Sequence, residues 1–448
     1  MICKTEHDLI TPAELQHLGT EDALRRRINY DTRTFVPGLI NLMRFEFSPR
    51  TQNFEFSAYY RIGAEWLDPQ QTTALVVTPK IPEIDFLEMF MTCLADARPE
   101  DDFSAIYDID FDVRPIQAPA LSAILSPLLV VQFLSVVERI AARSLRKGYV
   151  GCHENISKVK GRIDIIGNER HNILTGHRER VLCRFDEFSA DTPENRYIKS
   201  ALCIAGDMIA MMADHRAYPF LAAKWRSCLS AFASVADVRP TRLPAVKHNK
   251  LYRDYTEALR LASMLVRRRD LSVSSLSHAA SRFVPVFRID MALLFEHYTL
   301  ALLRRRFGSR AILYQAKGYR CRFVPDFLLN TTGDTSSTGA TPLKAILDAK
   351  YIPGYNKRLE VEPRYIRQLA GYARDKTLLR LLHIDTTNED TVPILPCVIL
   401  YPLPTRAVSS SPSSSSSLSF SYAPIPSDNT VKFFRCPVPV PLLPFPPR

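Results

Sequence analysis

Two short apolar runs near residue 340 predict neighbouring β-strands. They read R-F-V-P-D-F-L-L-N (322–330) and L-K-A-I-L-D-A-K-Y (343–351), and a stretch rich in Thr, Ser and Gly joins them. Apolar runs around a turn-rich connection predict two adjacent strands. Because side chains alternate between the two faces of a strand, Asp348 and Lys350 point the same way, and a hairpin brings Asp326 beside them.

The first 115 residues carry runs of β-branched and aromatic residues, which predict a β-rich N-terminal domain (1–115). We expect strands at 54–60, at 60–67 with a bend at Gly63, and at 73–79. Residues 87–95 predict a short helix or apolar turn. The acidic residues between 100 and 112 alternate with apolar ones, which predicts a solvated strand face.

Residues 116–284 predict a mainly helical middle region. One helix is expected from Pro127, with Ser126 as its N-cap and Gly148 as its stop signal, because proline is favoured in the first turn and glycine after the last. Its apolar part, 121–137, is short for a membrane span and runs into charged residues, so a buried helix is favoured. Residues 181–189 predict a strand, Thr192 and Pro193 open a helix of about five turns, and two more helices are expected near 219–235 and 249–268.

Residues 285–402 alternate between helical and strand patterns, which predicts an α/β core with a mixed sheet, ending in a strand at 394–400. From residue 403 the composition changes: 409–417 is nearly all Ser, and 436–447 is rich in Pro. The tail 403–448 is therefore expected to be disordered. Together the patterns predict a multidomain α+β protein.

Composition narrows the class of protein. The nine cysteines are scattered, with no C-x-x-C pair, which argues against a disulfide framework or a zinc site and for a reducing compartment. No signal peptide precedes the first domain, so a cytoplasmic location is expected. The formal charge of +11 is uneven: residues 1–115 hold 11 Lys/Arg and 20 Asp/Glu, whereas 285–402 hold 17 basic and 11 acidic residues. The basic part suits a polyanion, whereas the acidic part more naturally faces protein or solvent.

The cluster of Asp326, Asp348 and Lys350 predicts chemistry on phosphate. Two close carboxylates repel each other, and a divalent cation removes that repulsion. Their hard oxygen ligands suit Mg²⁺, which lowers the pKa of a bound water and stabilises charge on a phosphate. Lys350 would orient the attacking water or neutralise the transition state. The other interpretation is a surface hairpin with an ordinary Asp–Lys pair.

Pro325-Asp326 followed by Asp348-x-Lys350 is the signature of the PD-(D/E)xK nucleases. Two further features match that superfamily: Glu296, in a helical segment upstream, and Gln368-x-x-x-Tyr372, whose residues four apart share one helix face. The chain also resembles the McrC family, the nuclease subunits of McrBC modified-cytosine restriction systems, over roughly residues 1–402. That resemblance is carried by K-G-R-I-D (160–164), F-D-E-F-S-A-D-T (185–192), N-R-Y-I-K (195–199) and V-V-T-P-K-I (76–81).

The resemblance implies a Mg²⁺-dependent endonuclease with a restriction-endonuclease-like core in residues 285–402. Asp326, Asp348 and Glu296 would hold the metal, Lys350 would act in catalysis, and Gln368 and Tyr372 would support the site or bind DNA. It further implies double-stranded, modified DNA as substrate and a McrB-like AAA+ GTPase as partner. The partner would use the GTP itself and recognise the modified base, and the N-terminal part of this chain would dock on it and stimulate its GTP hydrolysis. Two alternatives stay open: a non-catalytic DNA-binding regulator of an AAA+ partner, and a stand-alone repair nuclease of similar fold.

Overall fold

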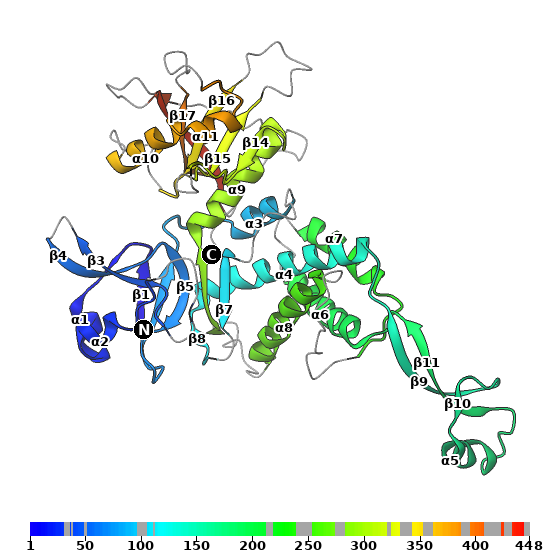
Figure 1. Cartoon of the computed structure of the whole chain (residues 1–448). Helices are drawn as coiled ribbons and strands as arrows, with labels where there is room; N and C mark the ends of the chain where they lie inside the picture. The colour runs from blue at the N-terminus through cyan, green and yellow to red at the C-terminus, as the bar shows by residue number, and fades with distance from the viewer. Residues whose placement is uncertain are drawn as a thin grey trace. The chain divides into compact units, whose positions relative to one another are not determined.

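A computed structural model of the 448-residue chain (Figure 1) describes most of the protein. The described residues are 1–30, 36, 39–48, 52–95, 105–110, 113–211, 218–238, 253–273, 283–319, 324–331, 343–352, 362–386, 395–406, 423–424 and 432–442. The chain divides into two compact units, one made of residues 1–124 and 282–448 and the other of residues 125–281. The acidic run at 100–104, most of the connection between the two strands of the candidate site, and the Ser-rich run lie outside the described residues.

The first unit contains a five-stranded sheet that is completed by a strand from far along the chain. Its order is β1 (Ile2–Thr5), β6 (Ala74–Thr78), β5 (Arg61–Trp66), β13 (Val286–Asp290) and β7 (Tyr107–Asp110). Only β1 and β6 are parallel. The backbone of β13 passes so close to Gly63, at φ +149°, that a Cβ there would lie 2.0 Å from the Phe287 carbonyl oxygen. The N-terminal sheet therefore includes residues 286–290, which the sequence patterns had placed in the C-terminal region.

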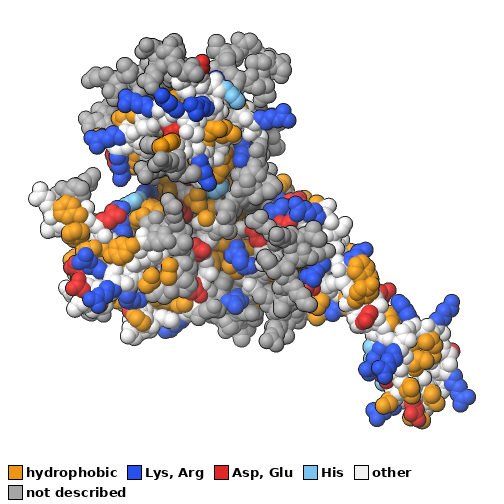
Figure 2. Space-filling model, viewed as in Figure 1, with side chains coloured by type: hydrophobic (Ala, Val, Ile, Leu, Met, Phe, Trp, Pro, Cys, Tyr) orange, Lys and Arg blue, Asp and Glu red, His pale blue; other side chains and the backbone are white. Residues whose placement is uncertain are grey.

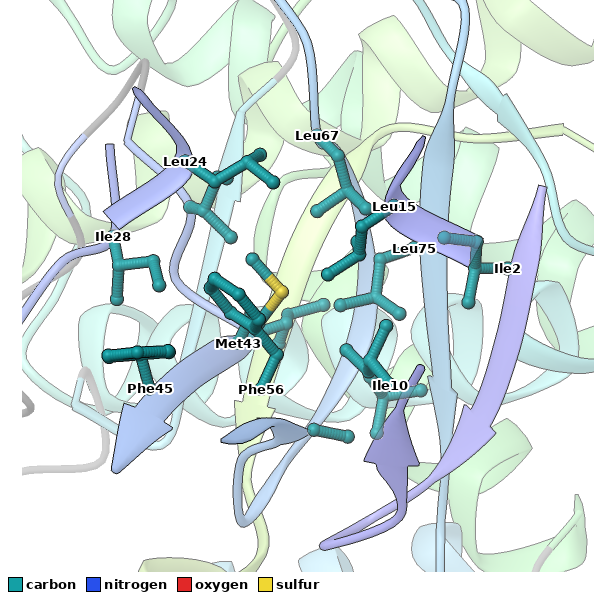
Figure 3. Close-up of a cluster of buried hydrophobic side chains, with 14 residues drawn as sticks. Ile2, Ile10, Leu15, Leu24, Ile28, Met43, Phe45, Phe56, Leu67 and Leu75 are labelled. Atoms are coloured by element: carbon teal, nitrogen blue, oxygen red, sulfur yellow. The ribbon is translucent and has the colours of Figure 1, made fainter. Parts of the chain in front are cut away.

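A smaller sheet and short helices pack on this N-terminal sheet. The three-stranded sheet has the order β2 (Leu9–Ile10), β4 (Asn53–Ala58), β3 (Met43–Ser48), and the helices are α1 (Pro12–Leu15), η1 (Gln16–Leu18) and α2 (Glu21–Arg25). Figure 3 shows their apolar side chains, among them Leu24, Met43 and Phe56, pointing toward one another. The predicted β-rich N-terminal domain thus has the expected strands, with small boundary shifts, together with short helices that were not expected. The predicted short helix is α3 (Phe86–Ala95).

Helix α4 (Pro119–Ala142) contains the boundary between the two units. It begins eight residues before the predicted start at Pro127, so Ser126 is not its N-cap. Proline is favoured in the first turn of a helix, so both Pro119 and Pro127 were compatible with the start of this helix. Among the described helices, none is long and apolar enough to cross a membrane. β8 (Ile116–Gln117) precedes the second unit in the sequence and β12 (Phe283–Val284) follows it, and the two strands pair with each other.

The second unit combines packed helices with a long antiparallel arm. The helices are α6 (Pro193–Ala210), α7 (Tyr218–Ala231) and α8 (Arg253–Val273), and the predicted cap is confirmed because Thr192 Oγ1 accepts from Asn195 N. Asn195 is buried, donates to the carbonyls of Arg146 and Ala190, and accepts from the hydroxyl of Tyr255. Asp191 and Arg196 form a two-point ion pair at 2.7 and 2.8 Å. The D-T-x-x-N-R residues thus hold these helices together.

The arm of this unit (148–189) was only half predicted. The strand at Val181–Ser189 is confirmed as β11, but β9 (Gly148–Ile156), which pairs with it along its whole length, was missed because Gly148 was interpreted as a helix stop. β10 (Arg162–Ile163), α5 (Ile165–Asn168) and η3 (Glu169–Ile173) lie at the far end of this hairpin (Figure 1). The mainly helical prediction is therefore correct for the body of the unit and wrong for the arm.

The C-terminal part of the first unit is a mixed sheet, as predicted. Its order is β14 (Ile312–Tyr314), β15 (Phe327–Asn330), β16 (Lys344–Ala349), β17 (Cys397–Arg406), β19 (Phe433–Leu442) and β18 (Ala423–Pro424), with β16, β17 and β19 parallel. Helices α10 (Pro363–Ala373) and α11 (Lys376–Leu381) cover one face through a shared apolar core that includes Leu328, Ile346 and Leu369. Helix α9 (Met291–Phe307) follows β13 directly and contacts β14 and β16.

The prediction of a disordered tail is wrong for β19, which is an inner strand of this sheet. The prolines of β19 alternate with valines, and Val438 and Val440 are fully buried. The carbonyls of Pro439 and Pro441 accept hydrogen bonds from Tyr298 Oη and Asp85 N, so the proline positions face away from β17. A proline has no N–H to donate, and in β19 the missing donors are on the side of the strand that does not pair with β17. Composition suggested disorder, whereas the period-two alternation was the relevant signal.

Candidate active site

Strands β15 and β16 bring the predicted Asp326, Asp348 and Lys350 together. Phe327 pairs with Leu347, so Asp326 lies opposite Asp348 at the end of the ladder. The backbone N–H of Ala349 donates to Asp326 Oδ2 at 2.7 Å, which fixes the first carboxylate against the second strand. By alternation, all three side chains share the sheet face of Leu328 and Ile346, which α10 and α11 cover. The hairpin inference from the sequence pattern agrees with this geometry.

Asp348 is the most buried member of the group, with 1% of its side chain exposed, and Lys350 Nζ lies 2.6 Å from its Oδ2. Beyond this ion pair, no N–H group among the described residues bonds to either oxygen of Asp348. A buried carboxylate without donors is costly unless a cation compensates it.

Glu296 reaches the same place from α9. The side chain of Asp290 caps this helix by accepting from Leu293 N, and Glu296 follows in its second turn. Glu296 Oε1 accepts a hydrogen bond from Gln315 Nε2 at 3.0 Å. Gln315 is a residue that sequence reasoning missed, because it belongs to no recognisable motif and meets Glu296 only through the packing of α9 on β14.

The pKa values of all three carboxyl groups are raised, chiefly by burial. Burial raises the pKa of Asp326 well above its usual value, and the charges of Asp348 and Glu296 raise it further. Burial likewise raises the pKa of Asp348 and of Glu296, and Asp348 adds to the shift of Glu296. Burial alone would lower the pKa of Lys350, but the charges of Asp348 and Asp326 outweigh it and the pKa is raised. The site therefore carries excess negative charge beside one ammonium group.

This donor set fits a hard divalent cation that keeps several of its waters. Asp326 and Asp348 offer carboxylate oxygens on adjacent strands, and among the described residues the one cation paired with Asp348 is the Lys350 ammonium group. Glu296 does not complete a three-ligand cluster: no group of three or more His, Cys, Asp or Glu side chains among the described residues is arranged to hold a metal ion. The fit is to two carboxylates, with Glu296 farther away.

Gln368 and Tyr372 lie on one face of α10, as their spacing predicts, and Gln368 Nε2 donates to Tyr372 Oη at 2.6 Å. Tyr372 is buried in the core below the site, and burial raises its pKa, with a further contribution from the charges of Asp348 and Asp326. Tyr372 thus lies near the carboxylates and supports them by packing. Gln368 is exposed and contacts Tyr372 rather than the carboxylates.

A cavity of about 530 Å³ opens beside these residues. Glu296, Asp326 and Lys350 line one side of it. The remaining lining includes residues that sequence reasoning did not assign to a site: His7, Tyr60, Lys80, Arg364 and Tyr365. Lys80 follows the V-V-T-P segment noted for its family resemblance, and this was the one signal in the sequence that pointed to it.

Comparison with known proteins gives a family. Residues 75–383 match the family model described as McrBC 5-methylcytosine restriction system component. No curated protein matches the chain. One similar solved structure is a refined half-complex from a tetradecameric assembly of Thermococcus gammatolerans McrB AAA+ hexamers with bound McrC, with 14% identity and a TM-score of 0.40 over 99% of this chain and 95% of that chain. Another is a cryo-EM structure of the Thermococcus gammatolerans McrBC complex, with 14% identity and a TM-score of 0.29 over 68% of this chain and 87% of that one. The family match spans more than half of the 448 residues, and the chain therefore belongs to the family of McrBC 5-methylcytosine restriction system components.

Proposed function

We propose that the chain is a Mg²⁺-dependent DNA endonuclease subunit of a McrBC-type restriction system, with a PD-(D/E)xK core made of the C-terminal sheet and helices α9 to α11. The observation that carries the proposal is the meeting of Asp326, Asp348 and Lys350 at the end of two paired strands, with Asp348 almost fully buried and ion-paired to Lys350. Excess buried carboxylate beside a cavity is the arrangement expected of a metal-assisted phosphodiesterase.

Asp326 and Asp348 would hold the Mg²⁺ ion, and Glu296 would act on it through a water. When bound, the ion supplies an acidified water and stabilises charge on the phosphate. Ala349 N keeps the Asp326 carboxylate in place, and Gln315 does the same for Glu296. Lys350, held by Asp348, would place a positive charge beside the phosphate as the water oxygen bonds to phosphorus and the P–O bond to the leaving oxygen breaks.

Duplex DNA is the substrate that the charge distribution favours. The C-terminal part (285–402) is basic, and the exposed Arg305 and Arg306 in the last turn of α9 belong to it. Figure 2 shows Lys and Arg side chains along the visible surface of this part. Because DNA binding depends on neutralising backbone phosphates, a basic surface beside the metal site fits this substrate. Any selectivity for modified cytosine would come from the partner.

The partner that we infer is a McrB-like AAA+ GTPase, which would bind the GTP itself. The acidic region 1–115, at a net charge of −9, is compatible with a protein-facing surface. The far end of the arm in the second unit adds a second candidate surface, because large apolar side chains are exposed there, including Ile165, Ile166 and Leu174 at 76%, 66% and 74%. Clustered exposed apolar residues mark protein interfaces more often than chance exposure does.

Divalent-ion binding separates the nuclease from a non-catalytic regulator. Isothermal titration of the full chain with Mg²⁺ should show one class of site in the wild type and in Asp22→Asn, an exposed control carboxylate in α2. Asp348→Asn should lose it. Retained binding in Asp348→Asn would contradict the assignment of the metal site and favour the regulator.

A further inference from the structure

The N-terminal sheet reaches the candidate active site because three of its strands end at the same edge. β1 and β6 are parallel, and Thr5 pairs with Thr78, so the residues that follow them, His7 and Lys80, lie at one edge. β13 and β6 are both antiparallel to β5 and therefore run in the same direction. β13 ends at this edge too, in Asp290, the cap of α9. The helix that carries Glu296 thus starts where His7 and Lys80 lie.

This edge is also fastened to the C-terminal sheet. Asp85 N donates to the carbonyl of Pro441 at 2.9 Å, and Tyr298 Oη, on α9, donates to the carbonyl of Pro439 at 3.0 Å. Both acceptors belong to β19, which pairs with β17. Helix α9 and these hydrogen bonds join the two sheets of the first unit. Residues from both sheets line the cavity.

Two cations of the cavity rest on aromatic rings. Lys80 Nζ is 5.6 Å from the ring centroid of Tyr351, the residue after Lys350. The Arg364 guanidinium is 4.8 Å from the centroid of Tyr365, and its Nη2 donates to Tyr365 Oη at 2.9 Å. A ring below a long side chain limits its rotamers, so less conformational entropy is lost when the cation binds an anion. Both cations line the cavity.

The cavity is electrostatically divided. Loss of water around the His7 imidazole and the positive charges of Lys80, Arg44 and Arg364 together lower its pKa to about 4, and the three cations mark a positive region. The acidic groups that face the cavity are Glu296 and Asp326 at the metal end and Glu362, which pairs with Arg364 at 2.6 Å. Glu6 lies behind Lys80 and accepts from its backbone N–H at 3.0 Å. One end therefore suits a cation and the other suits an anion.

We propose that Lys80 of the N-terminal sheet and Arg364 of α10 bind a DNA backbone phosphate that flanks the scissile one, so that the nuclease site is built from both sheets of the first unit. The inference rests on the proposed nuclease function and assigns to the acidic N-terminal region a direct contact with substrate. Lys80 and Arg364 are positioning residues here: they hold the strand so that the next phosphate lies at Asp326, Asp348 and Lys350. Neither touches the reacting atoms.

The test measures binding and cleavage separately. Fluorescence anisotropy of a short labelled duplex, with Ca²⁺ in place of Mg²⁺, is followed over a salt series for the full chain and for Lys80→Gln, Arg364→Gln and Lys80→Arg. Lys4→Gln is the matched control, because Lys4 lies on β1 of the same sheet, pairs with Glu14 at 2.9 Å and does not line the cavity. The logarithm of the DNA-binding constant falls linearly with the logarithm of the salt concentration, and each lost phosphate contact reduces the magnitude of this slope by about 0.9. The same proteins are then assayed for DNA cleavage in Mg²⁺ with the cognate GTPase.

We expect Lys80→Gln and Arg364→Gln each to reduce the magnitude of this slope by about one and to weaken DNA binding several-fold. In the cleavage assay, each variant should raise KM by a larger factor than it lowers kcat. Lys80→Arg should restore both, and Lys4→Gln should match the wild type. If a folded Lys80→Gln and a folded Arg364→Gln keep the wild-type slope while the wild type cleaves DNA, this inference is wrong and the nuclease proposal stands. If both variants lose slope but the wild type never cleaves, the phosphate contact stands and the nuclease proposal is wrong.

Discussion

Replacing Phe433 by Ala tests whether the end of the chain is part of the fold. Phe433 begins β19, is 2% exposed, and packs in the core formed by the C-terminal sheet with α10 and α11. Truncating a fully buried phenylalanine costs about 4 kcal/mol, from lost burial and from the cavity that remains. For a unit of this size about 1 kcal/mol corresponds to about 2 °C, so the melting temperature should fall by about 8 °C.

The matched control is Phe54→Ala in the same unit. Phe54 is 61% exposed and contacts the rings of Phe45 and Phe47, so its loss should cost about 1 kcal/mol, or about 2 °C. The chain has two tryptophans, Trp66 in the first unit and Trp225 in the second. Thermal scans of tryptophan emission in a Trp225→Phe background report the first unit alone. Equal shifts for Phe433→Ala and Phe54→Ala would refute the placement of β19 in the core.

Three further results are expected. Asp326→Asn should raise the metal-free stability by about 2 kcal/mol, because it removes the cost of burying or protonating this carboxyl group, keeps the bond from Ala349 N and can donate to Asp348. Stabilisation by Mg²⁺, about 2.7 kcal/mol at one hundred times Kd, should disappear. A lower metal-free melting temperature would argue against crowded carboxylates. Burial raises the pKa of Glu6 from 4.5 to about 7. Binding of its proton therefore stabilises the fold fully below about pH 4.5, and this stabilisation is lost as the pH rises to about 7. Glu6→Gln should flatten the resulting fall in melting temperature with pH, and an unchanged pH profile would contradict the assignment. The double variant Ile166→Ser, Leu174→Ser should abolish stimulation of the partner's GTP hydrolysis without changing thermal stability. Phe220→Ser on α7, where the side chain is 56% exposed, should leave the stimulation intact. Equal stimulation by the wild type, the double variant and Phe220→Ser would exclude the arm as the docking surface.

The parts of the structure that could be predicted are those specified by local sequence. The two apolar runs around a turn-rich connection predicted the hairpin that carries Asp326, Asp348 and Lys350, and Thr192 with Pro193 predicted the start of α6. These signals depend on residues two to four positions apart. Asp348 and Lys350 could therefore be placed on one face before any tertiary contact was known.

The parts that could not be predicted depend on contacts between distant segments. β13 joins β5 across more than 200 residues, and nothing in V-F-R-I-D indicates which sheet it completes. The proline alternation in β19 resembles a disordered tail unless β17 is known to lie beside it. Lys80 reaches the cavity only because β1, β6 and β13 end at one edge, which is a property of the topology.

The most direct test of the central claim is plasmid cleavage by the purified chain with its cognate GTPase, GTP and Mg²⁺. Asp348→Ala and Lys350→Ala are compared with Lys344→Ala, a control on the same strand β16 whose Nζ donates to the carbonyl of His383, away from the site. We predict cleavage of methylated DNA by the wild type and by Lys344→Ala, and none by the two site variants. Undiminished cleavage by Asp348→Ala and Lys350→Ala would contradict the active site described above.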